Sequence, residues 1–296
     1  MDHLLERLPF GERVQTRPKD RPRPTLISPR PIGAINPFLS SYHGVINGPP
    51  LCRIVLAVER PRGLPEILAL AGDSLQHGEP VLIFDAIDRE GETDLVFLSE
   101  AATPELVRLL RRDAGGLLCV ALSDEIRARL GLPFFSDLLA LGEPNYPTLG
   151  AIRQYRPRYD TRSAFGITLN HRSNFTGVPD NDRALTVRSL GELVRDAPRL
   201  TNAELRERFG RTFTSPGHIP LLYAAPRLVD ERKGHTELAI SLARMVGLSE
   251  SMTVCEMLGD SGGARSPEAA RRYADARGWV FLEGRTITEA WRTWSG

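Results

Sequence analysis

Residues 80–98 of the chain read PVLIFDAIDREGETDLVFL. The two ends of this stretch, residues 80–84 and 94–98, are apolar runs with the length of a buried strand, and both contain β-branched side chains. Between them, residues 85–94 carry five carboxylates within ten positions. The end of a strand is a common place for functional groups, because the sheet holds the backbone while the side chains reach solvent. We therefore predict two strands of one sheet with an acidic, functional connection between them.

The chain on either side alternates between strand-like and helix-like segments. Further short apolar runs predict strands at residues 116–122, 165–169, 185–187, 253–257 and 280–283. Apolar residues with helical spacing, several of them behind a serine or threonine cap, predict helices at residues 64–76, 104–112, 124–131, 202–209, 236–245 and 267–277. The sequence contains neither a glycine-rich dinucleotide fingerprint nor a Walker loop. We expect an α+β fold in which helices cover a mixed sheet within a single catalytic domain.

Residues 1–65 differ in composition from the rest, because they hold 11 of the 23 prolines. Proline fixes φ and disfavours helix in the residue before it, so we predict a disordered extension, interrupted by a strand-like run at residues 52–58. The catalytic domain is then expected at residues 66–296.

This extension has three competing explanations. A translation start placed too far upstream is favoured, since arginine-rich reading frames contain few stop codons. A genuine disordered tail is the second explanation. A basic arm that binds nucleic acid is the third, and it lacks the aromatic residues that would alternate with the arginines.

Bulk properties exclude several classes of protein. A formal net charge of +1 provides no global field that would attract nucleic acid or a membrane surface. Three cysteines leave one thiol unpaired, which argues against a disulfide framework. No apolar run is long enough for a membrane span, and the first residues lack the basic and apolar regions of a secretory signal. We expect a cytoplasmic protein with no nucleic-acid or membrane partner.

The acidic connection has the composition of a divalent-metal site. If it is extended, the acidic side chains at alternate positions point to the same side: Asp88, Glu90, Glu92 and Asp94. Such crowding of like charge is costly unless a cation lies among the carboxylates, and hard oxygen ligands suit Mg²⁺ or Mn²⁺. A solvated acidic turn is the alternative. Arg89 weakens the repulsion and could bind phosphate instead.

A second polar segment, RKGHTE at residues 232–237, begins a predicted helix. Helix N-termini attract anions, and Arg232 and the Thr236 hydroxyl add donors for a phosphate. The glycine before His235 permits close approach of the backbone, and His235 could add an imidazole ligand to a carboxylate metal site. An ordinary capped helix with an exposed histidine is the alternative.

Two further residues have the chemistry of proton transfer. His218 follows the tripeptide at residues 215–217, Ser-Pro-Gly, a predicted turn that would hold the imidazole in a fixed place. Glu256 lies in an apolar strand-like run, where burial of a carboxylate is costly unless it is paired or functional. Cys119, in contrast, is expected to be a small buried residue rather than a nucleophile.

Six segments, in the same order along the chain, resemble the 3,4-dihydroxy-2-butanone 4-phosphate synthase family of riboflavin biosynthesis. They are DREGETD at 88–94, DAGGLLC at 113–119, FTGV at 175–178 with Asp182 and Arg183, SPGH at 215–218, GHTE at 234–237 and VCE at 254–256. The resemblance covers residues 66–296 and is closer to the archaeal type than to the bacterial one. The chain departs from the bacterial pattern at Ala86 and Ile87, where acidic residues are usual, and at Lys233, which replaces a glycine.

The resemblance implies a lyase that converts D-ribulose 5-phosphate into L-3,4-dihydroxy-2-butanone 4-phosphate and formate. It implies an α/β/α sandwich, a homodimer with sites near the subunit interface, and Mg²⁺ or Mn²⁺ held by Glu90 and His235. His218 and Glu256 map onto essential proton-transfer residues, and we expect Asp88 and Glu92 to assist them. The substrate-binding positions are predicted to be Arg89, Glu90, Asp94, Arg232, Lys233, Gly234, His235, Thr236 and Glu256.

Two alternatives come from other functional classes. Another metal-dependent sugar-phosphate enzyme, an isomerase or an aldolase, would share these groups but would not release formate from D-ribulose 5-phosphate. An inactive relative kept as a binding module would have lost one or more of four residues that are all present here: Glu90, His218, His235 and Glu256.

Overall fold

The two apolar ends of the opening stretch are neighbouring antiparallel strands, β1 (Val81–Phe84) and β2 (Thr93–Leu98). The computed structural model describes residues 64–153, 160 and 162–294. The strand-like run at residues 52–58 and nearly all of the predicted extension lie outside these described residues. The domain boundary at residue 65 therefore stays a prediction.

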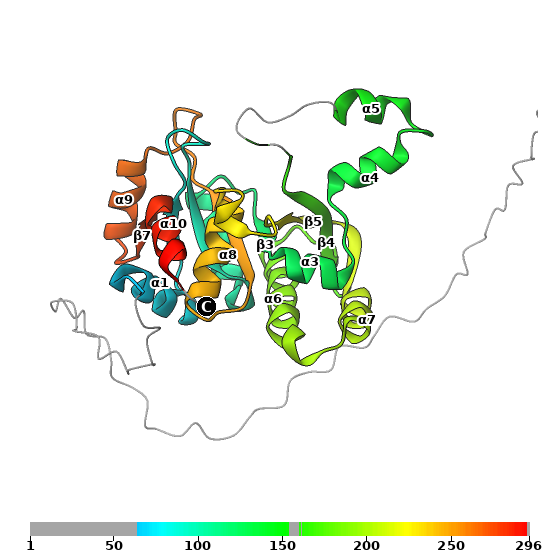
Figure 1. Ribbon diagram of the computed structural model, residues 1–296, viewed down its shortest axis with the longest axis horizontal. Helices are drawn as coiled ribbons and strands as arrows, with labels where there is room; N and C mark the ends of the chain where they lie inside the picture. The colour runs from blue at the N-terminus through cyan, green and yellow to red at the C-terminus, as the bar shows by residue number, and fades with distance from the viewer. Residues whose placement is uncertain (1–63, 154–159, 161, 295–296) are drawn as a thin grey trace, which may run out of the picture. The chain divides into compact units, whose positions relative to one another are not determined.

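The strands form one mixed sheet in the order β4-β5-β3-β6-β2-β1-β7 (Figure 1). The pairs β1–β7 and β3–β5 are parallel, and the other neighbours are antiparallel. The remaining strands are β3 (Cys119–Leu122), β4 (Phe165–His171), β5 (Phe213–Tyr223), β6 (Ser251–Glu256) and β7 (Phe281–Glu283). The strands predicted near residues 116–122, 165–169, 253–257 and 280–283 are thus confirmed.

Both faces of the sheet are buried, which explains why its strands are continuous apolar runs. Along β2, Leu95 and Phe97 belong to the core on one face, whereas Val96 and Leu98 belong to the core on the other. The first core contains side chains from α2 (Pro104–Asp113), α3 (Asp124–Leu130), α6 (Asp180–Asp196), α7 (Asn202–Thr212) and α9 (Pro267–Asp275). The second contains side chains from α1 (Glu66–Gln76), α8 (His235–Met245) and α10 (Gly284–Thr293). The α/β/α sandwich is confirmed.

Serine and threonine caps define several helix starts as predicted. The Thr103 hydroxyl accepts the backbone N–H of Leu106 at 3.3 Å at the start of α2. Ser123 and Ser266 make the same kind of bond at α3 and α9. Each bond satisfies a donor that the first helical turn leaves without a partner, so these ends follow from local chemistry.

The strand predicted at residues 185–187 is wrong, because these residues lie inside α6. The buried positions Ala184, Val187, Gly191 and Val194 recur at helical spacing along its 17 residues. A run of three apolar and β-branched residues is too short to distinguish the repeat of a helix from the repeat of a strand.

The turn predicted at residues 215–217 is also wrong, because this segment lies within β5. The register with β4 moves from the pair Leu169–Ile219 to the pair Asn170–Thr214, so residues 215–218 bulge out of the ladder. Proline is tolerated there because a bulged residue has no ladder bond to lose.

Four of the described helices were not predicted, among them α6 and α10, which both bury side chains in the core. The other two have no apolar stripe facing the core. They are α4 (Phe135–Gly142) and α5 (Pro147–Arg153), and neither buries a residue. In the part of the chain that the structure describes, no helix combines the length and the apolar character needed to cross a membrane.

Gly191 of α6 allows the helix to approach a short 3₁₀ helix, Ser99–Ala101, very closely. A Cβ at this position would lie 2.2 Å from the Glu100 amide nitrogen. We expect Gly191→Ala to lower the free energy of unfolding by about 2 kcal/mol or more, although alanine favours a helix interior by about 1 kcal/mol. Urea unfolding measures the change.

The matched control is Gly210→Ala in α7, where nothing lies within 4 Å of an added Cβ. That variant should be as stable as the parent or more stable. If both variants changed the free energy of unfolding by the same amount, the proposed close packing of α6 would be contradicted.

Candidate active site

The turn between β1 and β2 lines a cavity of about 380 Å³, together with the end of β6 and the start of α8. The antiparallel register of β2 and β6 places Asp94 opposite Glu256, which brings the end of β6 beside the acidic turn. Many of the residues predicted for the site line this cavity: Arg89, Glu90, Glu92, Asp94, Arg232, His235, Thr236 and Glu256.

Asp85, directly after β1, shapes the acidic turn. Its two oxygens accept the backbone N–H groups of Glu90 and Glu92, each at 3.1 Å. These bonds close residues 85–92 into a turn, so the extended arrangement predicted for the acidic side chains is wrong. As a consequence, Asp88 is exposed and does not line the cavity, whereas Glu90 and Glu92 do.

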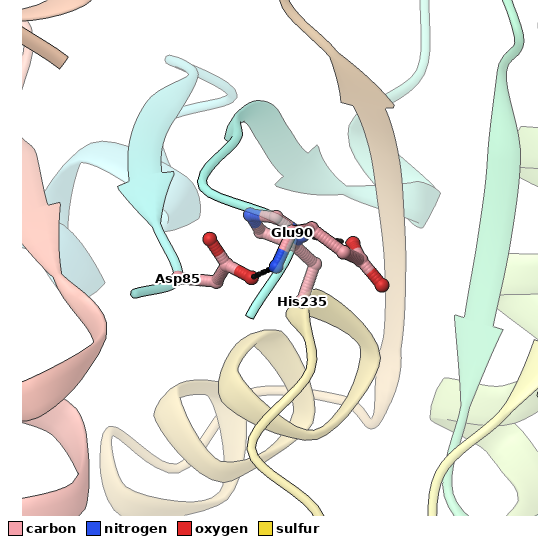
Figure 2. Close-up of side chains that lie close together, drawn as sticks. All are labelled: Asp85, Glu90 and His235. Carbon is pink, nitrogen blue, oxygen red and sulfur yellow. Dashed lines mark hydrogen bonds and ion pairs between the residues drawn. The ribbon is translucent and has the colours of Figure 1, made fainter. Parts of the chain in front are cut away.

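A carboxylate–imidazole group forms where this turn meets the start of α8 (Figure 2). The Glu90 Oε2 atom lies 3.4 Å from His235 Nδ1, and Asp94 Oδ1 lies 3.5 Å from His235 Nε2. One ligand atom each from Asp85, Glu90 and His235 lie within 4.8 Å of one another. The predicted pair of metal ligands, Glu90 and His235, is therefore brought together from segments that are 145 residues apart in sequence (235 minus 90).

Burial and crowded charge shift the pKa values in this group. Burial raises the pKa of Asp94 to about 8. Burial lowers the pKa of His235, but the surrounding carboxylates, Asp94 foremost, outweigh that effect and raise it to about 9. The hydrogen bond with His235 keeps the pKa of Glu90 below its usual value. The carboxylates around His235 thus favour its charged form, which would offset part of their negative charge.

The donor set fits a divalent cation. Asp94 Oδ1 is buried and has no hydrogen-bond partner among the described residues. Carboxylate oxygens combined with one imidazole nitrogen are suitable ligands for Mg²⁺ or Mn²⁺. A cation among them would supply the positive charge that otherwise comes from a proton.

The guanidinium groups of Arg89 and Arg232 also line the cavity, beside the start of α8. Arg232 Nη1 donates to Glu237 Oε2 at 2.6 Å, and Glu237 also accepts the backbone N–H of Ala225 at 2.8 Å. A Cβ on Gly234 would lie 2.2 Å from Arg232 Nη1 and 2.9 Å from Arg89 Nη1. Glycine is therefore needed at the helix start for both arginines to pack there.

Besides Asp88, two further predicted site residues, Lys233 and His218, do not line this cavity. Lys233 instead lines a neighbouring cavity of about 560 Å³. His218 is exposed on β5, where its backbone N–H donates to Asn170 Oδ1 at 3.0 Å. Leu222 on the same strand does line the active-site cavity, and four residues of strand separate it from His218 by about 13 Å.

Sequence reasoning missed three acids that shape the site: Asp85, Asp160 and Glu237. The sequence did point to two of them. Asp85 is the first acid after a predicted strand, and Glu237 belongs to the GHTE motif at residues 234–237. Nothing in the sequence pointed to Asp160, because it lies 72 residues before Arg232, which donates a hydrogen bond to it. Cys119 is buried, and burial raises the pKa of its thiol, as expected for a small core residue rather than a nucleophile.

Comparison with known sequences gives a consistent result. The sequence profile described as 3,4-dihydroxy-2-butanone 4-phosphate synthase matches residues 70–290. The 3,4-dihydroxy-2-butanone 4-phosphate synthase of Methanosarcina mazei is 44% identical over 227 residues, which cover 76% of this chain and 90% of that protein. The riboflavin biosynthesis protein RibBA of Mycobacterium tuberculosis is 34% identical over 217 residues, which cover 73% of this chain and 44% of that protein. The predicted similarity to the archaeal type is confirmed.

Solved structures show the same fold. The 3,4-dihydroxy-2-butanone 4-phosphate synthase of Candida albicans is 29% identical with a TM-score of 0.55, and the match covers 74% of this chain and 94% of that one. A structure of a 3,4-dihydroxy-2-butanone 4-phosphate synthase in complex with two magnesium ions is 23% identical with a TM-score of 0.56, and the match covers 73% and 92% of the two chains.

Proposed function

The chain belongs to the 3,4-dihydroxy-2-butanone 4-phosphate synthase family and is a lyase of riboflavin biosynthesis, and from this premise we propose how its residues carry out the reaction. The substrate is D-ribulose 5-phosphate, and the products are L-3,4-dihydroxy-2-butanone 4-phosphate and formate. One observation carries the proposal: the acidic turn, His235, Glu256 and two arginines line a single cavity.

Glu90 and His235 would hold Mg²⁺ or Mn²⁺, with the buried Asp94 Oδ1 as a neighbouring oxygen donor. When bound, the cation supplies Lewis-acid stabilisation of negative charge that develops on the sugar oxygens. The relative whose structure contains two magnesium ions supports a divalent cation at such a site. The carboxylates and the imidazole also orient the sugar's hydroxyl groups.

The substrate's phosphate would bind at the start of α8. The backbone N–H groups of the first helical turn, the Thr236 hydroxyl and the Arg232 guanidinium are donors that suit a dianion. Arg89 reaches the same place from the acidic turn, since both guanidinium groups pack against Gly234. The sugar would then extend from the phosphate towards Glu90 and His235.

Glu256 and Glu92 are the carboxylates we assign to proton transfer. Glu256 ends β6 opposite Asp94, where a rigid strand holds it at the cavity wall. Burial and the nearby charge of Glu256 raise the pKa of Glu92, so Glu92 keeps a proton to higher pH and can deliver it to a departing hydroxyl group. Glu256 is then the base that removes a carbon-bound proton. Asp88 has no step in this proposal, because it does not line the cavity.

A second copy of the chain would supply His218. This residue is exposed next to Asn170, and the quoted motif at residues 175–178 exposes two apolar side chains beyond β4. Phe175 is 98% exposed and Val178 is 54% exposed. Large exposed apolar side chains beside a functional motif are typical of a protein interface. A homodimer that covers this surface would bring His218 to the partner's cavity.

We propose a cytoplasmic enzyme that acts on a small molecule. The formal net charge of +1 provides no global field for nucleic acid, which supports the absence of a nucleic-acid partner.

Formate release tests the proposed function directly. The full chain with Mg²⁺ and D-ribulose 5-phosphate should form formate and the four-carbon phosphate in equal amounts, measured together by proton and phosphorus NMR. Conversion of the substrate into another pentose phosphate without formate, by folded and metal-loaded protein, would instead establish an isomerase.

A further inference from the structure

Asp160 lies between the two arginines that the proposed function assigns to the substrate's phosphate. Its Oδ2 atom accepts a hydrogen bond from Arg232 Nε and lies 3.7 Å from Arg89 Nη2. Its side chain is only 8% exposed and lines both the active-site cavity and the neighbouring one. One carboxylate oxygen thus interacts with both guanidinium groups, which is the arrangement that a phosphate oxygen would need.

The two carboxylates that bind Arg232 are held in different ways. Glu237 belongs to α8, is fully buried, and is fixed further by the Ala225 N–H group, so it acts as a permanent anchor for Arg232. Asp160 reaches Arg232 from outside the helix, from the segment that precedes β4. Asp160 accepts the hydrogen bond from the Nε group of Arg232, and an arginine that binds phosphate through two parallel bonds uses such donors.

Residues 162–164, which precede β4, make contacts that do not involve Arg89 or Arg232. The Arg162 guanidinium lies 3.5 Å from the centroid of the Phe134 ring and 3.3 Å from the Asp137 carboxylate. The Ala164 carbonyl accepts the backbone N–H of Tyr223 at 2.9 Å. These contacts of residues 162–164 do not depend on whether Asp160 or a phosphate binds the arginines.

The carboxylates around Arg89 and Arg232 neutralise much of the positive charge that a phosphate would bind. Arg89 has Asp85 at 3.9 Å and Glu90 at 3.8 Å, so each arginine already has a carboxylate besides Asp160. With Asp160 in contact, little positive charge remains for an incoming anion. A dianionic phosphate can compete with a single carboxylate for these donors, whereas a neutral sugar or a monocarboxylate cannot do so effectively.

We propose that Asp160 is a specificity-determining residue that competes with the substrate's phosphate for Arg89 and Arg232. Its carboxylate weakens the binding of all anions at the start of α8 and excludes the weaker ones. The sugar phosphate displaces it on binding. This inference rests on the proposed function, because that function places the phosphate at these arginines.

The test compares two carboxylates on the same guanidinium group. Isothermal titration of inorganic phosphate into the full chain should show that Asp160→Asn binds phosphate about tenfold more tightly than the parent, since one competing charge is removed. Glu237→Gln should bind phosphate more weakly, because Arg232 loses its anchor. Asp196→Asn is the matched control, since Asp196 pairs with Arg195 and Arg208 away from the cavity and should leave phosphate binding unchanged.

Acetate titrated in the same way provides the specificity readout. Asp160→Asn should gain measurable acetate binding, and the KM for D-ribulose 5-phosphate should fall without a matching rise in kcat. Asp160→Ser gives the same test if the asparagine variant folds poorly. Unchanged or weaker phosphate binding in a folded Asp160 variant would overturn the proposal and make Asp160 a bystander or a second anchor. Formate release by the parent chain is scored separately, so a failure of the proposed function is distinguishable from a failure of this inference.

Discussion

Replacement of Glu90 or His235 by alanine is expected to lower kcat/KM for formate release by at least about 10³-fold, since metal stabilisation of developing charge contributes several kcal/mol. EDTA should produce the same loss in the parent chain, and added Mg²⁺ should reverse it. The reason is geometric: Glu90 and His235 reach the cavity from the acidic turn and from α8, with ligand atoms 3.4 Å apart. No other described imidazole lines that cavity.

A direct binding measurement separates metal loss from misfolding. Isothermal titration of Mg²⁺ should show weaker binding in both variants, while circular dichroism and the Tm remain close to those of the parent. Glu207→Ala is the control, since Glu207 is an exposed acid on α7 that pairs with Arg211 and does not line the cavity. Parent-like turnover by folded Glu90→Ala or His235→Ala would contradict the metal assignment.

A mixture of two inactive variants, His218→Ala and Glu256→Ala, is expected to recover about a quarter of the parent's activity. If the site of one chain uses His218 from its partner, a mixed dimer has one intact site and one site that lacks both residues. Random exchange of subunits makes about half of the dimers mixed, so about a quarter of all sites become active. The recovery should follow the rate of subunit exchange.

The same mixture distinguishes the alternatives. If His218 served the cavity of its own chain, every site in a mixed dimer would lack one residue and no activity would return. A sedimentation measurement on the parent chain provides the control, because the recovery requires a dimer. Absence of recovery from a mixture shown to contain mixed dimers would contradict the role of the second copy.

The fold followed from the sequence wherever local chemistry was decisive. The run at residues 80–98 predicted β1 and β2 because its apolar ends are long enough for strands and are divided by charged residues. Thr103 and Ser266 marked helix starts, because a hydroxyl cap acts on N–H groups within three residues of it. The local pattern failed at residues 185–187 and 215–217, where a short segment has no period of its own and the neighbouring packing decides its conformation.

The candidate site was predictable in its composition but not in its geometry. The acidic strand end, the helix start at His235 and the polar Glu256 in an apolar run are visible without long-range information, and the family resemblance singled out Glu90 among the acids. The sequence could not show that Asp85 would close the acidic turn with two backbone bonds. It predicted Asp88 at the same site, since an extended chain was assumed there, and the turn excludes this residue from the cavity.

The pattern of residues 80–98 was enough to predict two strands and the acidic connection between them, and it indicated a divalent cation as the partner of those acids. The tertiary structure decided which of those acids face the cavity and what they meet there. The β2–β6 register placed Asp94 opposite Glu256, the start of α8 brought His235 to Glu90, and packing placed Asp160 between two arginines. Helix caps and hydrophobic periodicity depend on residues close together in the sequence. The contacts named here join segments far apart in the sequence, so they depend on how the whole sheet and its helices pack.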